Sequence, residues 1–379
     1  MLQMSKTVTT PIERPFFNNL NGLRFVGALT VLIFHCFTLQ REIWGNFFNG
    51  TIFHFVFSVA SKGHLGVNLF FVLSGFLITY LLLHEYARTG KINILNYLLR
   101  RFLRIWPLYF LVVLFGFFLF PKLPYGIVTI HEFWRFALFL SNFDEIIHGI
   151  NDKINFLSAT WSVSIEEQFY LVWGFLLGLI PFKKLFSFPV FFVVIILGSI
   201  VFRSFYWFDS RIIYFHTFSV MSDLGIGGFI GFLAFKGKIQ SSFERVKKWQ
   251  WIVFYVISTL LILGSNSIFE GSLIAFERTV IGIIFAIVIL EQVYAKNSFY
   301  KIDKIPYFFS SGELTYGFYM FHCILIYYWS TFFKTHGFTD HLWQFLVYVV
   351  LVFFSTYVVA WISLHYFERP ILGLKKYFR

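Results

Sequence analysis

The stretch "GLRFVGALTVLIFHC", residues 22–36, has the composition of a membrane-spanning helix, yet it contains Arg24 and His35. Ionisable groups inside a membrane are costly and are functional-site candidates by default. The two residues are eleven positions apart, which on an α-helix is close to three full turns and about 16 Å of rise. They therefore share one helix face at two depths. The alternative is that Arg24 extends to the interface and His35 is a packing hydrogen-bonder.

The composition around this stretch is that of an integral membrane protein. Hydrophobic residues make up 58% of the 379 residues and charged residues 13%, about half the charged share usual in soluble domains. Ten apolar runs have the length of about 20 residues that a membrane-spanning helix needs. We expect an all-α, polytopic bundle of about ten transmembrane helices, at residues 22–41, 63–84, 104–120, 163–180, 187–207, 214–235, 250–268, 275–295, 314–334 and 342–366.

The placement of Lys and Arg predicts the orientation of the bundle. With the N-terminus inside, 22 of the 31 Lys and Arg residues fall on the cytoplasmic side, as the positive-inside rule requires. Both termini are therefore expected in the cytoplasm. The net charge of +12 is then explained by orientation and by contact with anionic membrane lipids, and no nucleic-acid partner is expected. The first apolar run lacks a signal-peptide cleavage pattern, so we expect it to be retained.

The chain reads as one membrane domain over residues 1–379, without a visible repeat or a second soluble domain. It comprises a cytoplasmic tail at 1–21, an extracytoplasmic loop at 121–160 and a cytoplasmic tail at 367–379. A polar loop as long as 121–160 is typically functional or separately folded. Residues 42–62 are aromatic and are expected at the outer interface.

Only two cysteines occur, Cys36 and Cys323, which excludes a disulfide framework and a four-cysteine metal site. Each directly follows a histidine, but neighbours on a helix point about 100° apart. We therefore expect structural roles for both thiols, and we predict no metal.

A basic cluster, "RRFLRIWPLY", occupies residues 100–109. Arg101 and Arg104 are three positions apart and therefore lie on one helix face. Planar guanidinium groups suit phosphate, so the cluster is a candidate phosphate site on the cytoplasmic side. Anchoring by the positive-inside rule is the alternative explanation.

The segment "TWSVSIEEQFYLVW", residues 160–173, opens the fourth span from outside. Glu166, Phe169, Tyr170 and Trp173 follow helical spacing and form one stripe that combines a carboxylate with an aromatic wall. Glu167 lies near the positive end of the helix, where an acid is favourable. The helix end explains Glu167 alone. It does not explain two adjacent acids, Glu166 and Glu167, which point in different directions on a helix.

In two further segments, the small or polar residues are explained first by the packing of helices. "GHLGVNLFFVLSGFLITYLL", residues 63–82, contains Gly63, Gly66, Ser74 and Gly75, small residues that permit close approach of a helix or a ligand. "GELTYGFYMFHC", residues 312–323, carries Tyr319 and His322 on the ninth span. A lone histidine at such a position is usually a packing residue.

Taken in order, these segments resemble the acyltransferase type 3 family of bacterial membrane acyltransferases. The resemblance spans nearly the whole chain and rests on Arg24 with ten residues before His35, "GVNLFFVLSGFLI", "RRFLRIWPLY", "WSVSIEEQFYLVW", "LTYGFYMFH" and "YFERPIL". The segment "MSDLGIGGFIGFL" matches only partly, because Met221 stands two residues before Asp223, where family members often carry Arg.

The resemblance implies a multi-pass protein of the bacterial inner membrane. Such a protein would transfer an acyl group, usually acetyl, from cytosolic acyl-CoA to a hydroxyl of an extracytoplasmic glycan or a lipid-linked sugar. Some relatives carry a fused extracytoplasmic hydrolase-like domain. This chain ends without one, so we expect it to act alone or with a separate partner.

Acyl transfer to a hydroxyl needs a general base, and histidine is the usual choice near neutral pH. We predict that His35 is this base and that Glu166 either orients it or holds acceptor hydroxyls. The remaining predicted contacts divide into two groups. Acyl-CoA is expected at Arg24, Arg101, Arg104 and Ser74, and the acceptor at Glu167, Tyr170, Trp161, Tyr319 and His322.

Two alternatives remain open from the sequence. His35 could act as a nucleophile and carry the acyl group as an acyl-imidazole. The protein could also be a transporter or flippase for an anionic lipid or sugar, in which the same groups line a path. That reading is less favoured because no inverted repeat is visible. We expect replacement of His322 to affect transfer less than replacement of His35.

Overall fold

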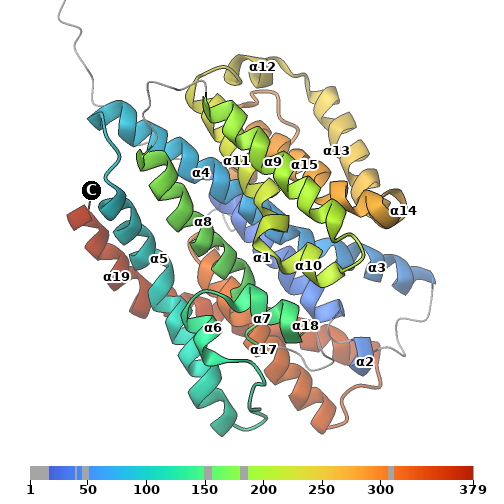
Figure 1. The fold of residues 1–379 in the computed structure, drawn as a ribbon. Helices are drawn as coiled ribbons and strands as arrows, with labels where there is room; N and C mark the ends of the chain where they lie inside the picture. Colours follow the sequence, from blue (N-terminus) through green and yellow to red (C-terminus); the bar gives the residue numbers. More distant parts are fainter. Residues whose placement is uncertain are drawn as a thin grey trace, which may run out of the picture.

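The computed structural model describes residues 17–38, 41–44, 51–148, 156–179, 187–305 and 311–378, and within them every regular element is a helix (Figure 1). This confirms the all-α class. The α-helices are α1 (Asn18–Thr38), α2 (Arg41–Trp44), α3 (Thr51–Ser61), α4 (Gly66–Thr89), α5 (Ile94–Leu114), α6 (Phe133–Ala137), α7 (Ser141–His148), α8 (Thr160–Leu179), α9 (Ser187–Phe205), α10 (Ser210–Phe215), α11 (Thr217–Phe235), α12 (Gln240–Arg245), α13 (Lys248–Leu263), α14 (Ser265–Ile268), α15 (Ile274–Tyr294), α17 (Thr315–Thr335), α18 (Leu342–Ser363) and α19 (Arg369–Gly373).

Short 3-10 and π-helical segments extend or join several of these helices. The 3-10 segments are η2 (Lys62–Leu65), η4 (Phe120–Lys122), η6 (Gly271–Leu273), η7 (Ile302–Lys304) and η9 (Leu374–Phe378), and the π-helical segments are η3 (Phe115–Leu119) and η8 (Leu364–Glu368).

The protein is a multi-pass membrane protein by the length and apolarity of its helices. Among the described residues, 6 helical stretches are long and apolar enough to cross a membrane: Asn19–Thr38, Phe55–Thr89, Ile94–Lys122, Ser210–Phe235, Gly271–Tyr294 and Leu342–Phe378. Pro189–Phe205 and Lys248–Leu263 are shorter apolar helices. Helices α8 and α17 have 20 and 21 residues and carry more polar and aromatic residues. Each of the ten predicted spans thus overlaps a helix.

Helices α4 and α11 pack with their backbones in contact, and this pair forms the centre of the bundle. A Cβ atom at Gly75 would collide with the carbonyl of Leu224, and one at Gly227 would collide with the carbonyl of Val72. Gly63 and Gly66 lie equally close to the backbone of α1. Such close approach by small residues is a common way for membrane helices to associate. For these glycines the packing explanation therefore holds.

We expect Gly75→Ala to destabilise the protein, because the added methyl group forces α4 and α11 apart. Overpacking of this kind typically costs about 1–3 kcal/mol. Gly198→Ala is the matched control, because no heavy atom lies within 4 Å of a Cβ built on that helical glycine and alanine favours a helix. The midpoint of thermal unfolding in detergent should fall for Gly75→Ala only. Equal unfolding midpoints for Gly75→Ala and Gly198→Ala would show that the close contact between α4 and α11 does not determine stability.

The described part of the predicted loop 121–160 is folded onto the bundle. It contains α6 and α7, and Nε2 of Gln168 on α8 donates to the carbonyl of Phe139, 2.8 Å away, and to Oδ1 of Asn142, 2.9 Å away. Phe139 has a φ of 55°, a left-handed conformation that is uncommon for non-glycine residues. It turns the chain between α6, which contacts α5, and α7, which lies against α8.

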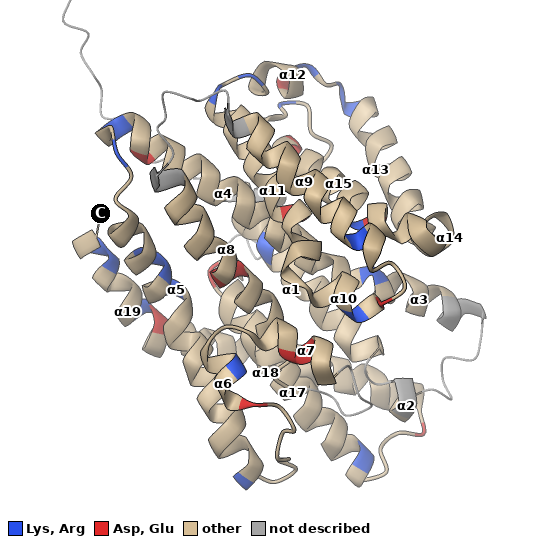
Figure 2. Cartoon of the chain, viewed as in Figure 1, with Lys and Arg blue, Asp and Glu red and all other residues tan. Residues whose placement is uncertain are grey.

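Lys and Arg lie mainly near the ends of the helices, as Figure 2 shows at α12 and at the connection between α4 and α5. The prediction that residues 42–62 lie at the interface falls partly outside the described residues. Within that range, α3 and η2 lead directly into α4.

Candidate active site

His35 is held by a second histidine from the other end of the sequence. Nδ1 of His35 on α1 lies 3.0 Å from Nε2 of His322 on α17, and the two rings stack with their centroids 5.0 Å apart. Nδ1 of His322 in turn contacts the carbonyl of Tyr319, one turn earlier on α17. The structure therefore brings together three of the residues that the sequence identified separately.

These contacts determine which nitrogen of His35 is basic. The carbonyl of Tyr319 can only accept a hydrogen bond, so Nδ1 of His322 must be the donor. In a neutral imidazole the other nitrogen is then an acceptor. Nε2 of His322 consequently accepts from Nδ1–H of His35, which leaves the lone pair of His35 on Nε2. An oriented base of this kind is what general base catalysis requires.

Cys323 completes this outer cluster, which we define as His35, His322, Cys323 and Tyr319. Its Sγ lies 3.3 Å from Nδ1 of His35 and 3.4 Å from Nε2 of His322. The sequence argument that adjacent helical residues point apart is wrong here, because the His322 ring folds back over its own helix turn. The side-chain donor atoms of His35, His322 and Cys323 lie within 4.8 Å of one another, which is also the spacing of metal ligands.

A second, inner cluster surrounds Glu166. Its two carboxylate oxygens accept hydrogen bonds from the hydroxyls of Ser74, at 2.9 Å, and Tyr170, at 2.8 Å. The hydroxyl of Tyr170 also lies 3.1 Å from Oγ of Ser74. Both oxygens of Glu166 are thus engaged with α4 and α8. The sequence left two roles open for Glu166, to orient His35 or to hold acceptor hydroxyls. The residue that contacts Nδ1 of His35 is His322, and no contact between Glu166 and His35 is seen among the described residues.

Three arginines complete the inner cluster. Arg24 and Arg104 interact electrostatically with Glu166 and Tyr170, and the guanidinium of Arg101 lies 5.3 Å from the ring centre of Tyr170. Arg104 is exposed, and Arg24 and Arg101 are half-buried. The inner cluster therefore offers accessible guanidinium groups, as a phosphate site requires.

Arg100, the neighbour of Arg101, has a different environment. Its guanidinium donates to Glu85 at 2.6 Å and to the carbonyl of Phe378 at 2.8 Å. These contacts fasten α5 to α4 and to the C-terminal segment, so Arg100 is a structural anchor.

Two further predicted acceptor residues, Glu167 and Trp161, lie beside the two clusters, and Tyr319 belongs to the outer one. Oε2 of Glu167 accepts from the indole of Trp106, at 2.8 Å, while Oε1 is buried and has no partner among the described residues. Trp161 is buried against Phe71 and Tyr214, with ring centres 6.0 and 5.1 Å away. The hydroxyl of Tyr319 lies 2.8 Å from Oγ of Ser162. Tyr319 therefore lies next to His322, Trp161 packs among aromatic rings, and Glu167 faces α5.

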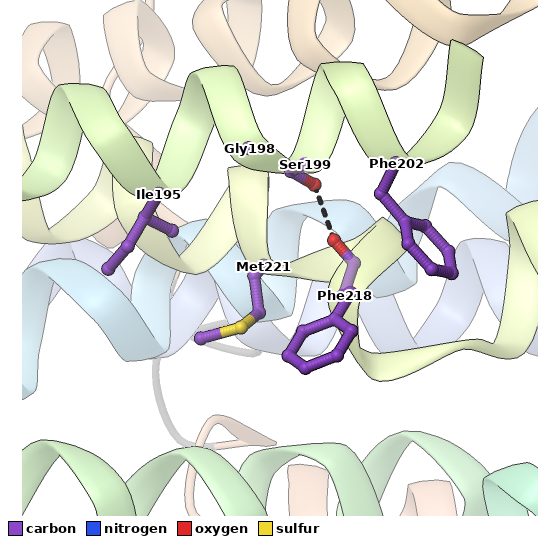
Figure 3. Close-up of a pocket in the computed structure, with 6 residues that line it drawn as sticks. All are labelled: Ile195, Gly198, Ser199, Phe202, Phe218 and Met221. Carbon is purple, nitrogen blue, oxygen red and sulfur yellow. Dashed lines mark hydrogen bonds between the residues drawn. The ribbon is translucent and has the colours of Figure 1, made fainter. Parts of the chain in front are cut away.

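Figure 3 shows a groove of about 290 Å³ between α9 and α11. Its lining residues are Ile195, Gly198, Ser199, Phe202, Phe218 and Met221. The hydroxyl of Ser199 already donates to the carbonyls of Phe218 and Ser219, at 2.7 and 2.8 Å. The groove therefore supplies no free base or nucleophile. Met221 lies in its wall, whereas Asp223 pairs with Arg278 on α15, at 2.8 Å.

A third polar cluster holds the segment between α5 and α8 together. Asp144 on α7 accepts from Nδ1 of His131 and from Arg135, the latter at 2.8 Å. Burial alone would raise the pKa of Asp144, but these two hydrogen bonds outweigh it and lower the pKa below its ordinary value. His131, Asp144 and His148 have the spacing of metal ligands, although Arg135 already engages the carboxylate.

His35, which contacts His322, and Arg24 of the inner cluster lie along one helix, α1. A family sequence model described as an acyltransferase domain matches residues 17–365. The chain therefore belongs to this acyltransferase family, which confirms the resemblance of its motifs. No solved structure matches the chain.

Three relatives illustrate the similarity. O-acetyltransferase OatA of Staphylococcus aureus strain NCTC 8325 is 29% identical over 378 residues, which cover 94% of this chain and 57% of the relative. A protein of S. aureus strain COL, provisionally named O-acetyltransferase SACOL0978, is 27% identical over 389 residues, with 97% and 59% covered. Peptidoglycan O-acetyltransferase OatA of Listeria monocytogenes is 30% identical over 188 residues, with 46% and 26% covered. The chain thus spans less than two thirds of the length of these relatives.

Proposed function

We propose that the protein is an O-acetyltransferase that moves an acetyl group from cytosolic acetyl-CoA to a hydroxyl of an extracytoplasmic or lipid-linked glycan. The observation that carries the proposal is the hydrogen bond between His35 and His322, which presents a basic Nε2. The names of two relatives, both O-acetyltransferases, support acetyl as the transferred group. The name of one of them, a peptidoglycan O-acetyltransferase, supports a cell-envelope glycan as the acceptor.

The donor occupies the inner cluster in this account. Arg24, Arg101 and Arg104 bind the phosphates of acetyl-CoA, and Ser74 and Glu166 hold one another in place beside them. His35 lies eleven residues beyond Arg24, about 16 Å along the helix axis. The extended arm of the donor can therefore run along α1 and present its thioester near His35.

The reaction at the outer cluster is a direct transfer. Nε2 of His35 takes the proton of the acceptor hydroxyl as its oxygen attacks the carbonyl carbon of the thioester. The tetrahedral intermediate collapses, the carbon–sulfur bond breaks, and the leaving thiolate of CoA takes the proton from the imidazolium of His35. His322 keeps the reactive nitrogen in position, because its own Nδ1 is committed to the carbonyl of Tyr319.

The test is transfer by the purified full chain. Protein in detergent is incubated with radiolabelled acetyl-CoA and a cell-envelope glycan extract, and the products are separated and analysed by mass spectrometry. We expect labelled, base-labile acetyl esters on the glycan. A labelled protein that accumulates without acceptor would favour the acyl-imidazole route. Loss of activity after chelation would instead indicate a metal, and the effect of Cys323→Ser on metal content would show whether the His35, His322 and Cys323 cluster holds it.

We further propose ten membrane spans with both termini in the cytoplasm and location in the bacterial inner membrane. The support is the distribution of Lys and Arg, 22 of 31 on one side, together with the helix that overlaps each predicted span. Two of these helices, α8 and α17, contribute site residues. Their lower apolarity is compatible with spanning because their polar groups face other helices.

Cysteine labelling tests this orientation. Lys376 and Lys334 are both exposed, near the C-terminus and at the end of α17. In the background of buried native cysteines, we expect Lys376→Cys to react with an impermeant maleimide only from the cytoplasmic side and Lys334→Cys only from outside. Reaction of both from the same side would contradict the ten-span topology.

A further inference from the structure

Two histidines and an aspartate converge in the segment between α5 and α8. His131 precedes α6, and Asp144 and His148 lie one turn apart on α7. Nδ1 of His131 contacts Oδ2 of Asp144, and Nδ1 of His148 lies 3.4 Å from Oδ1 of the same carboxylate. The centres of the two imidazole rings are 5.4 Å apart, and the rings are nearly perpendicular, at 84°. Both histidines thus present a ring nitrogen to one carboxylate.

The Nδ1 atom of His148 forms no hydrogen bond with the described residues. Elsewhere, Nδ1 of His336 and Nδ1 of His365 each contact the carbonyl four residues earlier on the helix, at 2.9 Å. His148 is the last residue of α7, yet its Nδ1 faces the side chain of Asp144 instead. This nitrogen is buried and has no hydrogen-bond partner among the described residues. Because an unpaired buried polar atom is costly, a ligand that engages Nδ1 of His148 would be favoured.

Arg135 holds the carboxylate of Asp144 but leaves one oxygen for a ligand. Its Nη1 donates to Oδ1 of Asp144, at 2.8 Å, and its Nη2 lies 3.1 Å from the carboxylate of Glu132, which offsets part of its charge. Oδ2 of Asp144 faces His131. Carboxylates that bind a metal ion are commonly hydrogen-bonded by a neighbouring residue, which fixes their orientation. The contact with Arg135 is therefore compatible with a metal ion at Oδ2.

The chemistry of this ligand set favours zinc. Imidazole nitrogen and carboxylate oxygen are both zinc ligands, at about 2.0–2.2 Å from the ion. The donor atoms of His131, Asp144 and His148 lie within 4.8 Å of one another, so rotations of the imidazole rings can bring all three to one ion. Three protein ligands leave a fourth tetrahedral position for water. The set contains no cysteine, so the presence of only two cysteines in the chain does not bear on it.

We propose that His131, Asp144 and His148 form a binding site for one Zn²⁺ ion, with Nδ1 of each histidine and Oδ2 of Asp144 as ligands. Both imidazoles bind in the neutral form, and zinc replaces the hydrogen bond between Nδ1 of His131 and Oδ2 of Asp144. The side chains of His131 and His148 are 7% and 23% exposed, whereas that of Asp144 is buried, so the ion enters from the histidine side. The inference does not depend on the proposed function.

Zinc at this site fastens α7 beside the outer cluster. Helix α7 is already bonded to α8, where Oγ of Ser141 lies 2.8 Å from Oγ of Ser164. Glu145, the neighbour of Asp144, interacts electrostatically with Cys323. The ion connects the chain before α6 to this helix. Since zinc binds a site that only the folded chain forms, it stabilises the folded protein by mass action.

Metal binding is measured on the purified full chain in detergent, which is freed of metal with a chelator and then titrated with Zn²⁺ against a chromophoric chelator. We expect one high-affinity site per chain in the wild type. We expect the same in Cys323→Ser, which removes the thiol from the other candidate set, His35, His322 and Cys323. Zn²⁺ should also raise the midpoint of thermal unfolding. Co²⁺ in the same site should give weak visible bands without the intense near-ultraviolet absorption of a thiolate ligand.

Arg135→Gln should weaken zinc binding by about 10- to 100-fold, the usual effect of losing a residue that orients a metal ligand. His148→Ala removes a ligand and should weaken zinc binding further. It should fold normally, because the side chain is 23% exposed and its Nδ1 forms no hydrogen bond with the described residues. His336→Ala is the matched control, since His336 is an exposed histidine at the end of α17, and its zinc affinity should equal that of the wild type.

Absence of a zinc site in the wild-type protein overturns the inference, as does an equal zinc affinity of the wild type, His131→Ala and His148→Ala. Loss of binding in Cys323→Ser, with normal binding in His148→Ala, assigns the metal to the outer cluster and overturns the inference too. In each of these cases His131, Arg135 and Asp144 form only an ion-pair network that connects the chain around α6 to α7.

Discussion

Replacement of His35 by alanine should lower acetyl transfer by about 10²- to 10⁴-fold, the usual contribution of a positioned general base. The amount of folded protein should change little, because His35 is only half-buried and its main contact is one hydrogen bond to His322. Specific activity and the yield of monodisperse protein must be measured separately. A packing histidine would show the opposite pattern, with less protein and normal specific activity.

His322 provides an internal comparison, and the structure gives a new reason for its expected result. Sequence reasoning predicts a weaker effect for its replacement, because an isolated histidine on a helix is usually a packing residue. The hydrogen bond to His35 leads us to expect a clear loss in His322→Ala as well, smaller than in His35→Ala, since His35 would remain as an unoriented base. Equal activity of His322→Ala and wild type would show that the orientation of His35 does not depend on this contact.

Replacement of Arg104 by alanine should weaken binding of acetyl-CoA by about 10- to 100-fold, the cost of losing hydrogen bonds to a charged group. Arg104→Lys should restore only part of the affinity, because an ammonium cannot reproduce the planar fork of a guanidinium. Isothermal titration calorimetry on the purified protein measures both values. Arg101→Ala should weaken binding in the same direction.

Arg100→Ala is the matched control for this series. Arg100 is an arginine on the same helix, but its guanidinium is bonded to Glu85 and to the carbonyl of Phe378. Its replacement should lower thermal stability and leave the affinity for acetyl-CoA unchanged. If Arg101→Ala and Arg104→Ala also bind the donor normally, the arginines are topology anchors, as the positive-inside rule alone would suggest.

The sequence predicts those parts of the site that lie on one helix. The spacing of Arg24 and His35 on α1 follows from helix geometry, and the glycines of α4 predict close packing because only their small size allows it. The approach of Arg104 to Glu166 and of Arg101 to Tyr170 does not follow from helix spacing, since four helices, α1, α4, α5 and α8, contribute residues to the inner cluster.

Contacts between distant segments could not be predicted in this way. His35 and His322 are 287 positions apart, and no periodicity reports which two helices face each other. Cys323 belongs to the outer cluster because its Sγ lies 3.3 Å from Nδ1 of His35 on α1, a contact between helices that sequence spacing does not determine. The Arg278–Asp223 pair was missed for a related reason. The family pattern often has Arg at the position of Met221, two residues before Asp223, whereas the arginine that pairs with Asp223 comes from a helix 55 residues later.

The role of His35 is best tested in sealed proteoliposomes, with labelled acetyl-CoA only on the cytoplasmic side of the protein and glycan only on the other side. We expect wild-type protein to place labelled acetyl esters on the glycan, and we expect equally well-folded His35→Ala protein not to do so. Normal acetylation by His35→Ala would contradict the mechanism. Passage of unmodified glycan across the membrane, without ester formation by the wild-type protein, would show a transporter instead.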